Sequence, residues 1–260
     1  MRFIRYAILF GGIFILLFAL GFLFQLDFAT RIWPWPDGRL SYLFIGSILA
    51  AVSAAALWIG WTGELGALPA GSLNVFVIAL GCVFYLFPLA AERPGLLVFS
   101  WVSLGYVLIS GLTFLWSRRI PLSESLPTPM PVRVSFGIFV ASLLFAGTAL
   151  ILRRPIFPWE LNPDSSVIFG CIFIGDAFYF LHALIRPYWR NAAGQLLSFL
   201  AYDLALIIPF LRLFGTVDPA LRLNLTLYVL VLIYSGAVAV YYLFLNPRTR
   251  NWLSPARQTG

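Results

Sequence analysis

The chain has no lysine and one histidine, and charged residues make up only 10% of its 260 residues. An ordinary soluble domain carries about 25% charged residues. The sequence also contains no P-loop, no dinucleotide-binding glycine fingerprint and no H-E-x-x-H, G-x-S-x-G or C-x-x-C motif. These absences argue against the familiar soluble catalytic sites and favour a non-catalytic protein.

Cysteine is also scarce, and basic charge takes one form. The two cysteines, Cys82 and Cys171, fall inside apolar runs on different predicted helices, so we expect small packing residues and neither a disulfide nor a metal pair. All 17 basic residues are arginines, placed singly or in pairs at the ends of apolar runs. Since no long basic stripe exists, nucleic-acid binding is excluded.

Apolar residues, by contrast, make up 61% of the chain, and the mean hydropathy is +0.93. They form successive runs close to the ~20 residues that a helix needs to cross ~30 Å of hydrocarbon. The lipid bilayer is therefore the expected surrounding of the chain. We predict an all-α integral membrane protein of about eight transmembrane helices, at residues 4–24, 40–61, 71–91, 95–116, 133–152, 166–185, 194–214 and 222–245.

The second half of the chain repeats features of the first. One fixed shift places Pro34-Trp35 on Pro158-Trp159 and Gly46 on Gly170, and a slightly longer shift places Gly12 on Gly137. We predict two tandem four-helix repeats, which run parallel because each copy has an even number of spans. The expected units are a first repeat at 1–120, a Pro-rich hydrated linker at 121–132 and a second repeat at 133–260.

The arginines also predict the orientation. More of them lie at the span ends that share a side with the N-terminus than at the other ends. Because cytoplasmic loops carry the excess of basic residues, we expect both termini in the cytoplasm.

Pro-Trp segments precede the second and sixth predicted helices. Trp is the usual anchor at the headgroup level of a membrane, and Pro stiffens a chain that is about to re-enter lipid. The alternative is a recognition ledge for a lipid or a partner subunit. We interpret this set mainly as interfacial anchors: Trp33, Pro34, Trp35, Pro158 and Trp159.

The run Pro158-Trp159-Glu160-Leu161-Asn162-Pro163, followed by Gly170, resembles an element of uncharacterised bacterial multi-pass membrane proteins. The first copy departs from this pattern, because Pro36-Asp37-Gly38 stands in the middle. The resemblance implies a location in a bacterial inner membrane, and it implies no activity.

Two acidic residues lie inside predicted spans. Asp176 and Asp203 stand at nearly equal distances from the loop between the sixth and seventh helices, so an antiparallel hairpin would place them at similar depth. A charged Asp there costs about 2.5–3.5 kcal/mol, and each must be paired, hydrogen-bonded or protonated. The pair is a candidate proton or cation site.

Other polar residues share the faces that carry these two acids. At helical spacing they form one strip on the sixth helix and one on the seventh, which we expect to face each other. The alternative is that hydroxyl groups satisfy two structural carboxyl groups, at about 0.6 kcal/mol per interhelical bond. The strips comprise Tyr179, His182 and Arg186, and Gln195, Ser198 and Tyr202.

The first copy lacks these polar residues. Val52 and Ala79 stand where the second copy has Asp176 and Asp203. We therefore expect any site to be built in the C-terminal half.

His182 is the only histidine of the chain. A lone intramembrane His is able to serve as the axial ligand of a haem- or chlorophyll-type metal. A hydrogen-bonded core residue is the more common role, and no other metal ligand set is predicted. The sequence therefore identifies no cofactor.

Two functional hypotheses remain. The first is an accessory membrane subunit that packs against other subunits, lipids or pigments through its 25 Phe, 11 Tyr and 9 Trp residues. The second is a proton- or cation-coupled transporter of small solutes centred on Asp176 and Asp203. Short loops and few intramembrane charges favour the first, and the acid pair favours the second.

Overall fold

A computed structural model describes residues 2–255, and every regular element among them is a helix. Eight of these helices are long and apolar enough to cross a membrane, which confirms the predicted number of spans and fits an integral membrane protein. They are α1 (Arg2–Leu23), α3 (Arg39–Thr62), α4 (Leu68–Glu92), α5 (Leu97–Ser117), α6 (Met130–Ile151), α7 (Pro163–Ile185), α8 (Trp189–Leu213) and α9 (Arg222–Val240). A four-residue helix, α2 (Asp27–Thr30), lies between α1 and α3.

Local sequence signals explain several helix ends. Proline occupies the first turn of α4, α6 and α7, where the missing N–H donor would be unpaired in any case. Asn162 caps α7 by accepting a hydrogen bond from the amide of Asp164 at 2.9 Å. Gly63 ends α3 at a φ of +79°, in the left-handed region that favours glycine.

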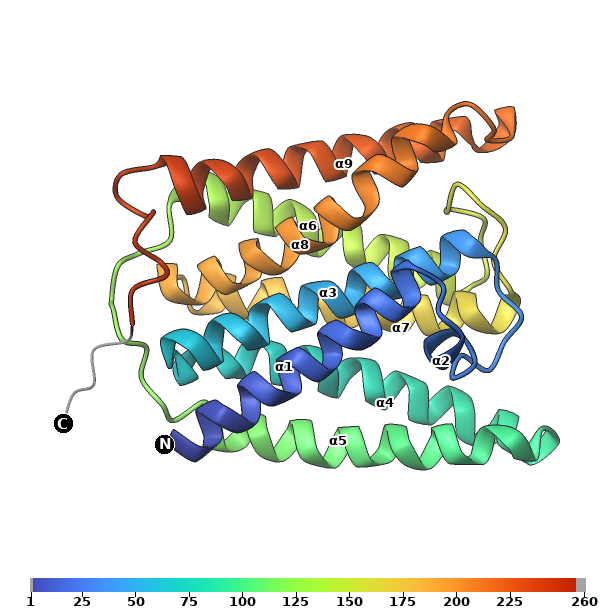
Figure 1. Ribbon diagram of the computed structural model, residues 1–260, viewed down its shortest axis with the longest axis horizontal. Helices are drawn as coiled ribbons and strands as arrows, with labels where there is room; N and C mark the ends of the chain where they lie inside the picture. The colour runs from blue at the N-terminus through green and yellow to red at the C-terminus, as the bar shows by residue number, and fades with distance from the viewer. Residues whose placement is uncertain (1, 256–260) are drawn as a thin grey trace.

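The helices pack as pairs around four central ones (Figure 1). In the first half α1 packs on α3 and α4 on α5; in the second half α6 packs on α7 and α8 on α9. The halves join where α3 packs on α8 and α4 packs on α7. Helices α1, α5, α6 and α9 therefore lie outside, and α3, α4, α7 and α8 lie inside.

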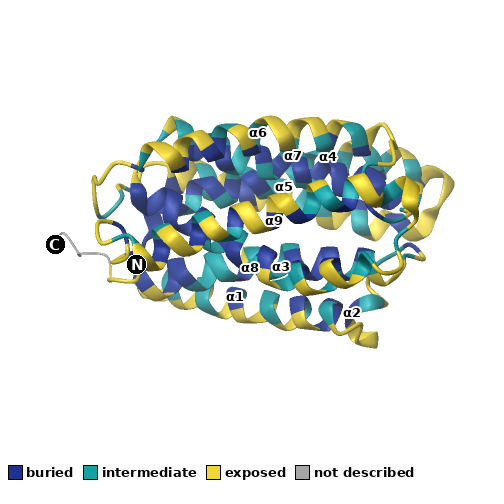
Figure 2. Cartoon of the chain, turned by 90° about the horizontal axis from the view of Figure 1, so that it is seen from above, coloured by how far each residue is buried: buried dark blue, intermediate teal, exposed yellow. Residues whose placement is uncertain are grey.

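The outer helices carry the exposed apolar residues. Figure 2 shows exposed residues along α6 and α9, while α7 is largely buried. Large side chains such as Phe10 on α1, Leu108 on α5 and Phe145 on α6 are exposed. A soluble monomer rarely exposes such a wide apolar surface. We call this surface of the outer helices the apolar belt, and it fits contact with acyl chains.

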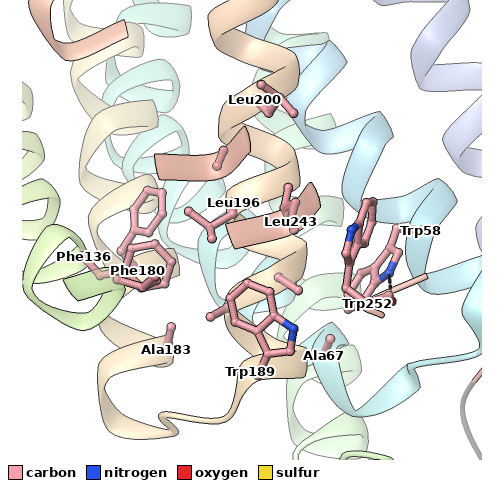
Figure 3. Close-up of a cluster of buried hydrophobic side chains, with 14 of the residues drawn as sticks. Trp58, Ala67, Phe136, Phe180, Ala183, Trp189, Leu196, Leu200, Leu243 and Trp252 are labelled. Atoms are coloured by element: carbon pink, nitrogen blue, oxygen red, sulfur yellow. Dashed lines mark hydrogen bonds between the residues drawn. The ribbon is translucent and has the colours of Figure 1, made fainter. Parts of the chain in front are cut away.

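One end of the bundle, which we call the terminal end, holds the start of α1 and the segment 246–255. Trp58 and Trp189 pack there with Phe136 and Phe180 in a buried cluster (Figure 3). The indole N–H of Trp58 donates to the carbonyl of Trp252 at 3.1 Å, and that of Trp189 donates to Thr249 at 3.0 Å. Buried indoles thus fix the C-terminal segment onto the bundle.

The segment between α5 and α6 is exposed at Pro121 and at 124–127, which suits a hydrated linker. It is extended, but it packs on the start of α8: the amide of Thr128 donates to Pro187 at 2.8 Å, and the amide of Trp189 donates to Leu126 at 2.7 Å. These two hydrogen bonds attach the segment to the start of α8.

Candidate functional site

A cavity of about 1040 Å³ lies among the transmembrane helices, and all eight contribute to its lining. Most lining side chains are apolar, among them Ala51, Leu143 and Phe173. Asp176 and Asp203 are the only acidic residues of the lining, which contains no basic residue. We call this space the central cavity.

Asp176 reaches the central cavity from α7. Its carboxyl group accepts a hydrogen bond of 2.6 Å from the side-chain amide of Asn74 on α4. The sequence predicts a site built by the C-terminal half alone. Asn74 belongs to the N-terminal half, so both halves contribute polar groups to the site. Sequence reasoning missed Asn74 because it lies 102 positions away and only the α4–α7 contact brings it near.

Asp203 lies on α8 and is 4% exposed. The hydroxyl of Ser235 on α9 donates to its Oδ1 atom at 3.0 Å. Its Oδ2 atom has no hydrogen-bond partner among the described residues. Gly236 lies near this oxygen, because a Cβ atom added to Gly236 would be 3.5 Å from Oδ2. As a glycine, it provides no side chain at this place. A buried acceptor that lacks a donor costs free energy, so Oδ2 is an unsatisfied group. The oxygen itself is buried, although the Asp203 side chain borders the cavity.

The polar strips of α7 and α8 meet as predicted at one place. The hydroxyls of Tyr179 and Ser198 are 3.3 Å apart, and Gln195 donates to the carbonyl of Tyr179 at 2.8 Å. Farther along α8, Tyr202 is hydrogen-bonded to Tyr228 of α9. The two acids themselves bind to α4 and α9 and make no hydrogen bond with each other.

His182 and Arg186 do not line the central cavity. His182 is buried, and its Nδ1 atom accepts a hydrogen bond of 3.2 Å from the side-chain amide of Asn191. Arg186 ends α7 and donates to the carbonyl of Arg118 at 3.4 Å. No group of three His, Cys, Asp or Glu residues within 2–255 is arranged to hold a metal ion. The geometry of His182 corresponds to the core role of a lone histidine.

The Pro-Trp segments turn their indoles inward. Trp35 is 7% exposed, so it packs within the protein and does not serve as the expected headgroup anchor. Trp33 donates to Asp37 at 2.6 Å, and Trp159 donates to the hydroxyl of Ser41 at 3.1 Å. Both are half-buried. Pro34 and Pro158 shape these turns, which join the two halves at the end opposite the terminal end.

A buried ionic cluster at the terminal end was not predicted. Arg190 is 1% exposed, and its guanidinium donates to Glu124 at 2.6 Å and to the carbonyl of Trp252 at 2.8 Å. Glu64 lies 3.8 Å from the guanidinium and accepts hydrogen bonds from Ser123. A glutamate and an arginine at the edges of apolar runs were the available signals, but their pairing depends on tertiary packing.

The two cysteines occupy one buried cluster between α4 and α7. Cys82 and Cys171 are free thiols and pack there with Trp35, Leu86 and Ile168. Their predicted packing role agrees with this placement.

Comparisons of the chain with protein-family models, with curated proteins and with solved structures found no match. The geometry alone therefore carries the functional argument. An apolar space inside a transmembrane bundle is suited to an apolar molecule, and two acidic residues without a basic one in its lining are suited to a hydrogen-bond donor.

Proposed function

We propose that this protein is a non-catalytic membrane protein that holds a largely apolar molecule in the central cavity. The proposal specifies the accessory role expected from the sequence: the molecule is a lipid or pigment held within the chain. The observation that carries it is an apolar cavity of about 1040 Å³ whose lining holds two acidic residues and no basic residue.

Size and lining both support this function. Ligand pockets commonly measure about 300–1,000 Å³ and combine an apolar lining with a few placed polar groups.

The test is to identify small molecules that copurify with the protein from its native membrane. Ala146 of α6 lines the cavity, whereas Ala149, three positions farther along the helix, does not. We expect a defined apolar molecule at near-equimolar amount in the wild type and in Ala149→Phe, and its loss in Ala146→Phe. Only bulk phospholipid in all three proteins would contradict the proposal.

Proton- or cation-coupled transport is the second candidate, because Asp176 and Asp203 line the same cavity. It requires ion-linked flux in vesicles that Asp176→Asn and Asp203→Asn abolish while insertion is kept. Equal flux in the wild type and in both variants removes this candidate.

We also propose that the two halves are tandem repeats. Exchange of α1, α3, α4 and α5 for α6, α7, α8 and α9 reproduces the set of helix pairs. Gly46 and Gly170 occupy matching places: a methyl group on Gly46 would lie 3.0 Å from the carbonyl oxygen of Ala19 on α1, and one on Gly170 would lie 2.7 Å from that of Gly147 on α6.

The close contacts do not support the expected match of Gly12 with Gly137. Gly12 lies against Leu57, with 3.0 Å from its added Cβ to the Leu57 side chain, whereas nothing lies within 4 Å of Gly137. The correspondence between α1 and α6 therefore rests on their contacts with Gly46 and Gly170, and not on the sequence match of Gly12 with Gly137.

We propose in addition that the terminal end faces the cytoplasm of a bacterial inner membrane. The arginine distribution along the sequence supports this orientation. Labelling of cysteines introduced at Arg119 and at Arg154, from either side of the membrane, tests it.

A further inference from the structure

The lining of the central cavity reaches the outer surface at two places. One is beside α5, where Tyr106 and Ile109 line the cavity and are 55% and 65% exposed. The other lies between α6 and α9. Ile138, Ser142 and Phe145 of α6 and Leu227 and Leu230 of α9 line the cavity and are also exposed. Phe145 is 74% exposed and Leu230 is 57% exposed. We call the opening between α6 and α9 the mouth, because Ser235 of α9 holds Asp203.

The two helices at this mouth are not a packed pair. They are connected near its two ends: the hydroxyls of Ser135 and Tyr234 are 2.7 Å apart, and the amide of Asn224 donates to the carbonyl of Pro155, after α6, at 3.1 Å. The exposed lining residues lie between these two bonds. The mouth is therefore framed by hydrogen bonds and has apolar sides.

The mouth opens on the apolar belt of the bundle. Leu227 and Leu230 are exposed on the same helix as Leu223 and Ile233, in the span that fits a bilayer. In a membrane this surface contacts acyl chains and not bulk water. A molecule that passes the mouth therefore comes from the lipid phase.

The unpaired Oδ2 atom of Asp203 lies near α9, one of the two helices at the mouth. Asp203 is held by Ser235 of α9, and its Oδ2 atom is near Gly236 of the same helix. Asp176, the second acid of the cavity, has Asn74 as its donor. With no basic residue in the lining, this set favours a head group that donates hydrogen bonds over one that is anionic.

We propose that the ligand is a single-chain amphiphile of the bilayer with a hydroxyl or amine head group, which passes laterally between α6 and α9 and binds Asp203. This inference rests on the proposed function and names its ligand class and route. The chain occupies the apolar cavity, and the Asp203 side chain turns so that its buried Oδ2 atom accepts a hydrogen bond from the head group.

The experiment uses reconstituted protein and two photoactivatable probes with the same alkyl chain, a long-chain alcohol and a fatty acid. Labelled residues are identified by mass spectrometry. We expect the alcohol to label cavity-lining residues at least tenfold more than the fatty acid, and Asp203→Ala to remove most of this labelling. A long-chain amine serves as the third probe and distinguishes the two donor head groups.

The route is tested by a reversible block. Ser142→Cys, in a chain with Cys82 and Cys171 replaced by Ala, is modified with a bulky disulfide-forming reagent that a reductant later removes. The control is Leu144→Cys, which is exposed on the same helix but does not line the cavity. We expect the block at position 142 to slow labelling at least tenfold and reduction to restore it, with no change for position 144.

The outcomes separate the two proposals. If no probe labels the cavity of the wild type in preference to the outer surface, the proposed function fails and this inference fails with it. If the cavity is labelled but the fatty acid competes equally, the ligand class is wrong. If the block at position 142 leaves the labelling rate unchanged, the route between α6 and α9 is wrong while the binding function stands.

Discussion

The terminal end and the central cavity each bury an ionisable side chain, and they differ in how many hydrogen-bond and ionic partners they supply to it. Arg190 meets Glu124, Glu64 and the carbonyl of Trp252. Asp203 has one donor, Ser235, for its two oxygens. In the first region the chain supplies nearly all partners, so the charge organises the fold. In the second the carboxyl group has a single donor and borders the cavity, so a bound molecule is able to supply another.

The largest expected effect is at the ionic cluster of the terminal end. Arg190→Ala leaves Glu64 buried without its cation, and removal of one partner of a buried pair costs about 3–5 kcal/mol. Thermal unfolding in detergent measures this loss. Arg31→Ala, at an ion pair whose side chains are both 79% exposed, is the control and should change stability by less than about 1 kcal/mol. Equal effects of the two variants would show that the cluster does not organise the terminal end.

The second effect tests whether the two halves are equivalent. Gly46→Ala and Gly170→Ala each force a methyl group against the backbone of the neighbouring outer helix, and such overpacking costs about 1–3 kcal/mol. Gly137→Ala on α6 meets nothing within 4 Å and should leave stability unchanged or slightly raised. A large loss at only one of the two close-contact glycines would contradict the proposed repeat.

The third effect has the opposite sign. Asp203→Leu removes a carboxyl oxygen that has no partner, so we expect the ligand-free protein to gain about 1 kcal/mol and to lose binding of the long-chain probe. Stability and photolabelling are measured on the same preparation. A loss of several kcal/mol, as at Arg190, would make Asp203 a structural group and end the contrast between the two regions.

The smallest effect concerns the donor that Asp203 does have. Ser235→Ala removes one interhelical hydrogen bond, which is worth about 0.6 kcal/mol on average within membranes. We expect a small loss of stability and, because both oxygens of Asp203 then lack a donor, tighter retention of the alcohol probe. Weaker retention would indicate that Ser235, and not Asp203, holds the head group.

The spanning helices were predictable because each needs only a local run of apolar residues. The start of α8 was not. The sequence predicts it at residue 194, whereas the helix begins at Trp189 and buries Arg190. In a sequence, an arginine beside an apolar run indicates a helix boundary. The burial of Arg190 depends on Glu64 and Glu124, which are distant in the chain.

The candidate site was predictable only in part, for the same reason. Asp176 and Asp203 were recognisable because an acid within a span is rare. Their donors, Asn74 and Ser235, are ordinary polar residues whose roles follow from the α4–α7 and α8–α9 contacts. The sequence predicts a surface anchor at Trp35 because it gives the residue type but not the direction of the side chain, and Trp35 is buried.

The most direct measurement is a high-resolution experimental structure of the protein prepared in lipid nanodiscs from its native membrane. We expect elongated density between α6 and α9 that enters the central cavity and ends within hydrogen-bond distance of the Asp203 Oδ2 atom. A cavity closed by its own side chains, or one that contains only ordered water or ions, would contradict the account.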